Sequence, residues 1–149
     1  MTKFTFRLEA ALRLRRMRVE SEIARLQDLF AQRKRLEQSL TSIRQERTEA
    51  SAFVQAAQPP SAGDLRALSL FTLGLESRTK TVREGLNRAE KSIAEQKQRL
   101  MKAERDERAL SNLRLERFAE WEARAQRETE TTAQELWLIS HTTNRDDRV

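Results

Sequence analysis

The chain has 149 residues, a length that fits one domain, yet 35% of them are charged, only 5% are aromatic, and there are three Gly and two Pro. So many charges with so few helix breakers are typical of long helices or a coiled coil, and they exclude a thick hydrophobic core. Lys and Arg number 29 against 23 Asp and Glu, and the net charge of +6 favours acidic proteins, nucleic acid or an anionic membrane as partners. Because acids are interspersed along most of the chain, a mixed-sign solvated helix surface is the simpler interpretation.

The cellular compartment is indicated by what the sequence lacks. Without Cys there are no disulfides or thiolate metal sites, which is compatible with a reducing compartment. The N-terminus has no apolar signal segment, and no window approaches the roughly 20 apolar residues that a membrane span requires. We therefore expect a soluble, cytoplasmic protein.

A regular spacing of apolar residues begins near Thr5. The residues recur in alternating steps of three and four, an average of about 3.5, which is the period of a left-handed coiled coil. This pattern predicts a helix over residues 5–56. Its main seam residues are Leu12, Val19, Leu26, Leu29, Leu36, Leu40 and Ile43.

The helix is interrupted by a segment that contains both prolines. Pro59 and Pro60 remove two amide donors and push the preceding residue out of the helical region. Ser61, followed three residues later by Asp64, forms a weak capping-box pattern. The sequence therefore predicts a turn over residues 57–64, a second helix over 65–140, and a polar, frayed tail over 141–149.

The second helix repeats the same spacing, with the main seam residues Val82, Leu86, Ile93, Leu100 and Leu110. If the chain folds back at the prolines, facing seam residues must have a constant sum of residue numbers. They do, since Leu36 falls opposite Leu86, Leu29 opposite Ile93, and Leu12 opposite Leu110. The sequence thus predicts an all-α fold, a long two-helix antiparallel coiled-coil hairpin in a single domain, with the second helix longer.

Some polar and small residues also fall within this pattern. Arg33 is expected opposite Ala89, with its head in water. Arg15 is expected opposite Glu107, as an ion pair that fixes the register. Gly74 and Gly85 lie inside the second helix, where they mark a bend, the close approach of a partner, or tolerated surface positions.

Catalysis is not indicated by any group of residues. His141 is the only histidine, and no Cys or carboxylate lies at metal-ligand spacing from it. A thin hairpin has no cleft that would desolvate a carboxylate such as Glu128 and raise its pKa. We expect a protein that is not an enzyme and has no cofactor, no metal and no small-molecule ligand.

Two features favour a protein partner. The densest basic cluster consists of Arg13, Arg15, Arg16 and Arg18. It is either a solvated helix face, a site for an acidic protein or, least favoured because no aromatic residues interleave, a nucleic-acid site. Trp121 and Trp137 lie near or beyond the reach of the first helix, so they are either interface anchors or packed on their own helix.

Three segments follow one another in a definite order and spacing. They are FTFRLEAALRLR at residues 4–15, RLERFAEWE at residues 114–122, and QEL at residues 134–136. Together they resemble the FliJ family, the small coiled-coil proteins of the flagellar type III export apparatus. The resemblance covers nearly the whole chain, including the central break. The last segment departs from the family pattern, with Gln134 where Asp is usual.

The resemblance implies a non-enzymatic stalk and chaperone-escort protein, whose paired termini enter a hexameric export ATPase. It assigns contact with the ATPase to Arg13, Arg15, Arg16, Arg18 and Trp121. Contact with the cytoplasmic domain of the membrane export gate is assigned to Phe71 and Leu75, one helical turn apart. The resemblance also implies binding of other export chaperones, and a cytoplasmic location at the inner-membrane export apparatus.

Other interpretations stay open from the sequence. The chain is also compatible with the equivalent stalk of a virulence type III secretion system. A nucleic-acid-binding helical arm would show affinity that falls steeply with salt. A generic coiled-coil scaffold would self-associate with the central break extended instead of turned.

Overall fold

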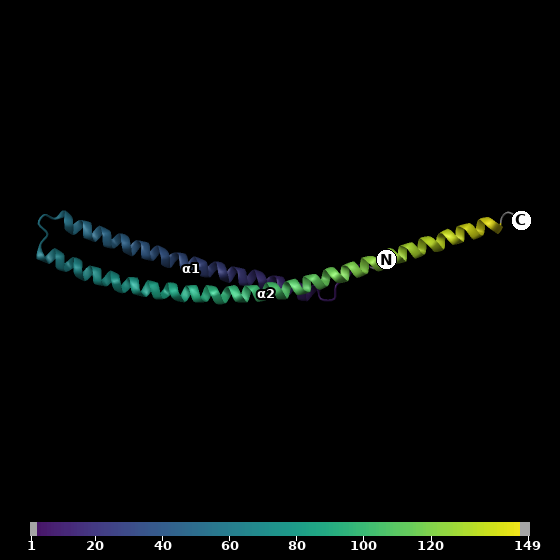
Figure 1. The fold of residues 1–149 in the computed structure, drawn as a ribbon, viewed down its shortest axis with the longest axis horizontal. Coiled ribbons are helices and arrows are strands. Elements are labelled where there is room, and N and C mark those ends of the chain that lie inside the picture. The colour runs from purple at the N-terminus through teal and green to yellow at the C-terminus, as the bar shows by residue number, and fades with distance from the viewer. Residues whose placement is uncertain (1–2, 147–149) are drawn as a thin grey trace. The chain divides into compact units, whose positions relative to one another are not determined.

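A computed structural model describes residues 3–146, which form two long helices and no strand (Figure 1). Helix α1 spans Glu9–Ala56 and helix α2 spans Ala62–Asp146, with 48 and 85 residues. The two helices form an antiparallel hairpin in which α2 is the longer. The fold class predicted from the apolar spacing and the central prolines is confirmed.

The first helix starts later than its spacing predicts. Residues 3–6 are extended and residues 7–8 form a turn, so α1 begins at Glu9 and not at Thr5. The amide of Glu9 donates to the carbonyl of Phe6 at 3.1 Å. Thr5 and the two flanking phenylalanines have low helix propensity, and the ring of Phe4 packs on side chains of α2, which holds this segment outside the helix.

The turn is shorter than predicted because Ser61 caps α2. The Oγ of Ser61 accepts from the amide of Asp64 at 3.0 Å, and the Ser61 amide donates to the Asp64 carboxylate at 3.2 Å. This is a complete capping box, which satisfies amides at the start of the helix. Helix α2 therefore begins at Ala62, three residues before the predicted start, and the turn covers residues 57–61.

The far end of α2 extends into the segment predicted to be a polar tail. The helix continues through His141 to Asp146, because no Gly or Pro follows Gly85 to break it. The imidazole of His141 stacks on Trp137, with ring centroids 4.1 Å apart. The remainder of the predicted tail, residues 147–149, lies outside the described residues.

The hairpin divides into two units. The turn unit is Val19–Ala103, and the terminal unit joins Met1–Arg18 to Glu104–Val149. All the main seam residues predicted above are buried or half-buried. In the turn unit the buried apolar residues are Ile43, Leu75, Ala89, Ile93 and Ala103, and in the terminal unit they are Leu12 and Ala125.

Contacts across the turn unit follow the antiparallel register. Arg78 donates to both carboxylate oxygens of Glu46, at 2.7 and 3.3 Å. Arg33, predicted to face Ala89, keeps its side chain 40% exposed, and its Nε lies 3.5 Å from the Glu37 carboxylate. Its guanidinium carbon lies 5.4 Å from the centroid of the Phe30 ring. The partly solvated position follows from the long stem, which carries the charge out of the seam.

A buried polar pair in the turn unit was not expected from the apolar spacing. Glu22 and Gln96 are only 6% and 4% exposed. The Nε2 of Gln96 donates to the backbone carbonyl of Glu22 at 3.1 Å and also to its carboxylate, while Arg25 donates to the other carboxylate oxygen at 3.3 Å. These bonds offset the cost of burying the carboxylate, and a shifted register would leave it unpaired.

The ion pairs of the terminal unit correct one predicted contact. Arg15 pairs with Asp106 at 3.3 Å, and Arg16 pairs with Glu107 at 3.3 Å. The predicted pair of Arg15 with Glu107 is therefore wrong. Arg15 is only half-buried on the seam, and its long side chain leaves the seam sideways to reach an acid on the flank of α2.

The two glycines inside α2 differ in their surroundings. A Cβ on Gly74 would meet no atom within 4 Å, so Gly74 is a tolerated surface position. A Cβ on Gly85 would lie 3.4 and 3.5 Å from the methyl carbons of Leu36, so Gly85 is a place where the two helices approach closely.

Replacing Gly74 by alanine should stabilise the fold by roughly 0.5–1 kcal/mol, because glycine in an exposed helix interior costs backbone entropy. Gly85→Ala should gain less, since its new methyl must fit against Leu36. Urea unfolding followed by circular dichroism measures both values. A loss of stability in Gly74→Ala would contradict the continuous exposed helix at this position.

The capping box makes stability depend on pH. Hydrogen bonds from the Ser61 hydroxyl and then from the Ser61 amide hold the pKa of Asp64 below its ordinary value. A carboxylate with a lowered pKa in the folded state stabilises above its unfolded pKa, about 3.9, and this contribution is lost as pH falls through the folded pKa. Asp64→Ala should thus destabilise at pH 7, and the difference should shrink towards pH 3. In a Ser61→Ala background, which loses the hydroxyl but keeps the amide at residue 61, the pH-dependent part of this difference should shrink; if it is undiminished, the Ser61 hydroxyl is not its main source.

Candidate functional site

Three aromatic rings pack against one another in the terminal unit, and we call them the aromatic cluster. Phe4 meets Phe118 edge-on, with centroids 5.2 Å apart and planes at 88°, and it lies 5.9 Å from Trp121. Phe118 and Trp121 are 5.7 Å apart. These contacts tie the extended N-terminal segment to α2, at positions more than a hundred residues apart in sequence.

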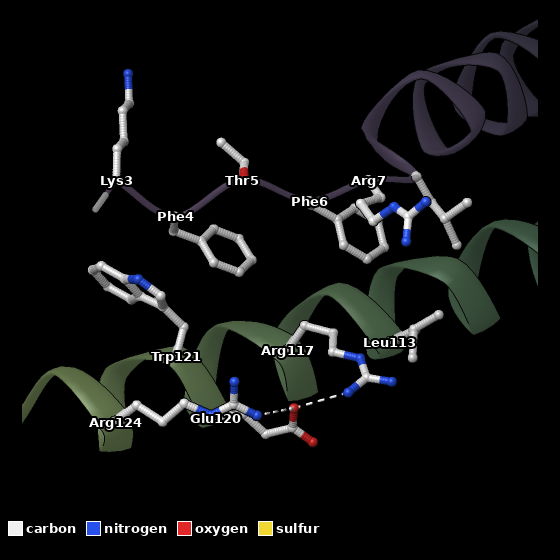
Figure 2. Close-up of a pocket in the computed structure, with 11 residues that line it drawn as sticks. Lys3, Phe4, Thr5, Phe6, Arg7, Leu113, Arg117, Glu120, Trp121 and Arg124 are labelled. Carbon is white, nitrogen blue, oxygen red and sulfur yellow. Dashed lines mark hydrogen bonds and ion pairs between the residues drawn. The ribbon is translucent and has the colours of Figure 1, made fainter. Parts of the chain in front are cut away.

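A groove of about 710 Å³ lies between the N-terminal segment and α2 (Figure 2). Its apolar walls are formed by Phe4, Phe6, Leu8, Leu113 and Trp121. Four cations line it as well, namely Lys3, Arg7, Arg117 and Arg124, against the single acid Glu120. Apolar walls with an excess of positive charge favour an apolar ligand that carries carboxylates.

The single acid does not cancel the charge of the groove. Arg117 donates to the carboxylate of Glu120 at 2.9 Å, and Arg124 lies at 4.0 Å from the same carboxylate with its side chain 74% exposed. Ion pairs as exposed as these are weak. Arg124 is therefore available to an acidic group from outside the chain.

The predicted basic cluster is only partly available to a partner. Arg15 and Arg16 pair with acids of α2, although their side chains stay 41% and 53% exposed. Arg13 and Arg18 are exposed and have no ion-pair partner among the residues that the structure describes. The net attraction of the cluster for an acidic surface comes mainly from these last two residues.

The two tryptophans have different surroundings. Trp121 is half-buried against Phe4 and Phe118, so it packs within its own chain and also lines the groove. Trp137 is 58% exposed and stacks on His141. Its neighbours Leu136, Leu138 and Ile139 are 56–62% exposed as well. We call residues 126–141 the C-terminal overhang, since no residue of α1 extends the antiparallel register that far.

The predicted gate-binding pair is divided between two environments. Phe71 is 44% exposed, but Leu75 is 3% exposed and belongs to the interface between the helices. The expectation that both residues form one exposed face is wrong, because Leu75 lies on the seam and Phe71 lies one position off it. Near the turn, the exposed apolar residues that sequence reasoning missed are Phe53, Leu65, Leu70 and Leu73.

Within residues 3–146, no group of three or more His, Cys, Asp and Glu side chains is placed to hold a metal ion. No helix in the described part of the chain is both long and apolar enough to span a bilayer. No protein-family model, curated protein or solved structure matches the chain. Hypotheses about function therefore depend on the surfaces described above and on the resemblance of the three sequence segments.

The aromatic cluster can be tested through the fluorescence of Trp121. In a Trp137→Phe background, Phe4→Ala should shift the emission to longer wavelength, because Trp121 loses a ring that shields it from water. The coupling between Phe4→Ala and Phe118→Ala in a double-mutant cycle should be about 0.5–1.5 kcal/mol. Phe53→Ala is the control, because this side chain is 82% exposed in the turn unit and should leave the emission unchanged. An unshifted spectrum in Phe4→Ala would contradict the cluster.

Proposed function

We propose that this protein is a FliJ-type stalk and chaperone-escort component of the bacterial flagellar type III export apparatus. In this role it has no catalytic activity of its own and couples the export ATPase ring to the membrane export gate. One observation carries the proposal. Two of the resembling segments, residues 4–15 and 114–122, meet each other in the terminal unit through the contact of Phe4 with Phe118 and the 3.0 Å ion pair of Glu9 with Arg114.

Two of the three segments that carry the resemblance, residues 4–15 and 114–122, therefore lie side by side in the terminal unit. The register predicted from the apolar spacing already brings residue 4 opposite residue 118, and the ring packing of Phe4 and the ion pair of Glu9 with Arg114 are the specific contacts at this place. The hairpin with a longer second helix is also the architecture that the resemblance implies. The proposal therefore has support from both sequence order and spatial arrangement.

The ATPase contact is proposed for the paired termini. Arg13 and Arg18 offer exposed positive charge to an acidic surface, and Trp121 offers an aromatic face beside the groove. Arg15 and Arg16 contribute less, because each already has an acid of α2 beside it. Charge of this kind speeds association and selects the partner more than it adds affinity.

The gate contact is proposed for the exposed apolar residues near the start of α2. Phe71 remains in this role, joined by Leu70 and Leu73, which are 65% and 59% exposed. Leu75 supports the helix from inside the interface. The proposed location is cytoplasmic, at the inner-membrane export apparatus, where other export chaperones are further partners.

The test is binding to a purified flagellar export ATPase. Combining Arg13→Glu, Arg18→Glu and Trp121→Ala should lower the affinity at least about tenfold, since charge and an aromatic anchor are lost together. Phe71→Ala and Arg44→Glu, both exposed positions of the turn unit, should leave ATPase binding unchanged. Circular dichroism confirms that each variant is folded. If the unmodified protein does not bind the ATPase, the proposed function is wrong.

A further inference from the structure

The face of α2 that packs against α1 does not end where α1 ends. From Phe118 onward, apolar and small residues continue in steps of three and four, so they stay on one side of the helix. We call this set the terminal stripe, and its residues are Phe118, Trp121, Ala125, Thr129, Thr132, Leu136 and Ile139. Leu136 and Ile139 are 62% and 60% exposed. Phe4 packs on Phe118 and Trp121, and Ala125 is 7% exposed, so the most exposed part of the stripe runs from Thr129 to Ile139.

The terminal stripe is complementary to itself in the antiparallel direction. When two copies run in opposite directions, Trp121 falls opposite Leu136, Phe118 falls opposite Ile139, and Thr129 falls almost opposite itself. The residue numbers of the first two pairs share one sum, the same relation that governs α1 and α2 within one chain. We propose that the terminal stripe of one chain pairs antiparallel with that of a second copy, forming a two-fold symmetric dimer.

The groove beside the N-terminal segment is the place where the second copy would arrive. In this register, Leu136 and Ile139 of the second copy lie over Trp121 and Phe118. Phe4 and Phe6 form the other wall of that groove, as Figure 2 shows for the chain alone. The groove is open in the single chain, and apolar side chains from the second copy would fill it.

Charge favours this occupant. Among residues 126–141, the acids Glu128, Glu130 and Glu135 outnumber Arg127, whereas cations outnumber acids around the groove. Arg124 and Glu135 lie on the same flank of the terminal stripe. Antiparallel pairing places Arg124 of one copy within about 3 Å, along the helix axis, of Glu135 of the second copy. Because the dimer is two-fold symmetric, the contact between Arg124 and Glu135 occurs twice.

One residue opposes the dimer. Glu128 lies beside the two-fold axis, so the two copies of its carboxylate approach each other. Like charges at such a distance disfavour association. Neutralising Glu128 should therefore tighten the dimer, a result that no unrelated partner of the overhang would explain. The dimer does not depend on the proposed export function, since it follows from the terminal unit alone.

Sedimentation equilibrium of the full chain provides the test. The 17.4 kDa chain should form dimers at about 10–100 µM, a range suited to an interface of one helix face from each copy. Leu136→Ser should weaken dimerisation at least about tenfold. Leu138→Ser is the matched control, because Leu138 is 56% exposed but lies on the opposite face, and it should have little effect.

Charge variants then test the register. Arg124→Glu and Glu135→Arg should each weaken the dimer about threefold to tenfold, and the two together should restore it. Glu128→Gln should tighten it. A chain that stays monomeric over the whole concentration range, including one that instead binds another protein through Leu136, overturns the proposal. Equal effects of Leu136→Ser and Leu138→Ser overturn it too.

The absence of cysteine allows a direct check of the direction of pairing. A single Thr129→Cys variant should form a disulfide between copies under mild oxidation. Thr132→Cys should not cross-link with itself, because antiparallel pairing separates the two copies of residue 132 by about 10 Å along the helix axis. If Thr132→Cys cross-links with itself as readily as Thr129→Cys, the pairing is not antiparallel, and the proposed dimer is wrong.

Discussion

Each helix of this hairpin has one face to bury and only the other helix to bury it against. The register between α1 and α2 is therefore the constraint on which the remaining features depend. A shift by one residue would turn the seam residues away from each other, and a shift by a whole heptad would leave the buried carboxylate of Glu22 without Gln96. The apolar seam supplies the burial, and the polar pair makes one alignment better than its near neighbours.

The same register determines what is left exposed. Helix α1 has 48 residues and α2 has 85, so when the two pair antiparallel from the turn, α1 ends well before α2 does. The N-terminal segment then leaves the helix and packs Phe4 on α2, which produces the aromatic cluster and the groove. Beyond this point α2 continues with apolar residues at the surface. The aromatic cluster, the groove and the exposed apolar residues at the end of α2 thus all lie in the terminal unit.

The sequence predicted much of this arrangement because coiled-coil spacing carries information about both helix type and register. The sequence predicted less well which partners the side chains beside the seam contact and how far they are buried. Spacing could not tell that Arg15 would reach Asp106 and not Glu107, or that Leu75 would be buried while Phe71 stays exposed. The sequence shows the capping-box pattern of Ser61 and Asp64, but the complete capping box starts α2 at Ala62, three residues before the apolar run on which the predicted start is based.

The aromatic cluster was harder to predict for a different reason. The register brings residue 4 near residue 118, but Phe4 lies outside the helix, so helical periodicity does not predict which rings it contacts. The resemblance names residues 4–15 and 114–122 as family segments but does not say that they touch, whereas in the structure Phe4 and Phe118 bring them into contact. The exposure of apolar residues such as Leu70 and Leu73 is also not predicted by the spacing, since apolar residues in a coiled coil are first assigned to the seam.

The register itself can be measured by cross-linking within one chain. Leu36 and Gly85 face each other closely, so Leu36→Cys combined with Gly85→Cys should form a disulfide within the monomer in dilute, mildly oxidising solution. Leu36→Cys combined with Ser92→Cys, one heptad further along α2, should not. The antiparallel hairpin would be contradicted if the second pair cross-linked as readily as the first, or if the first pair formed disulfides only between chains.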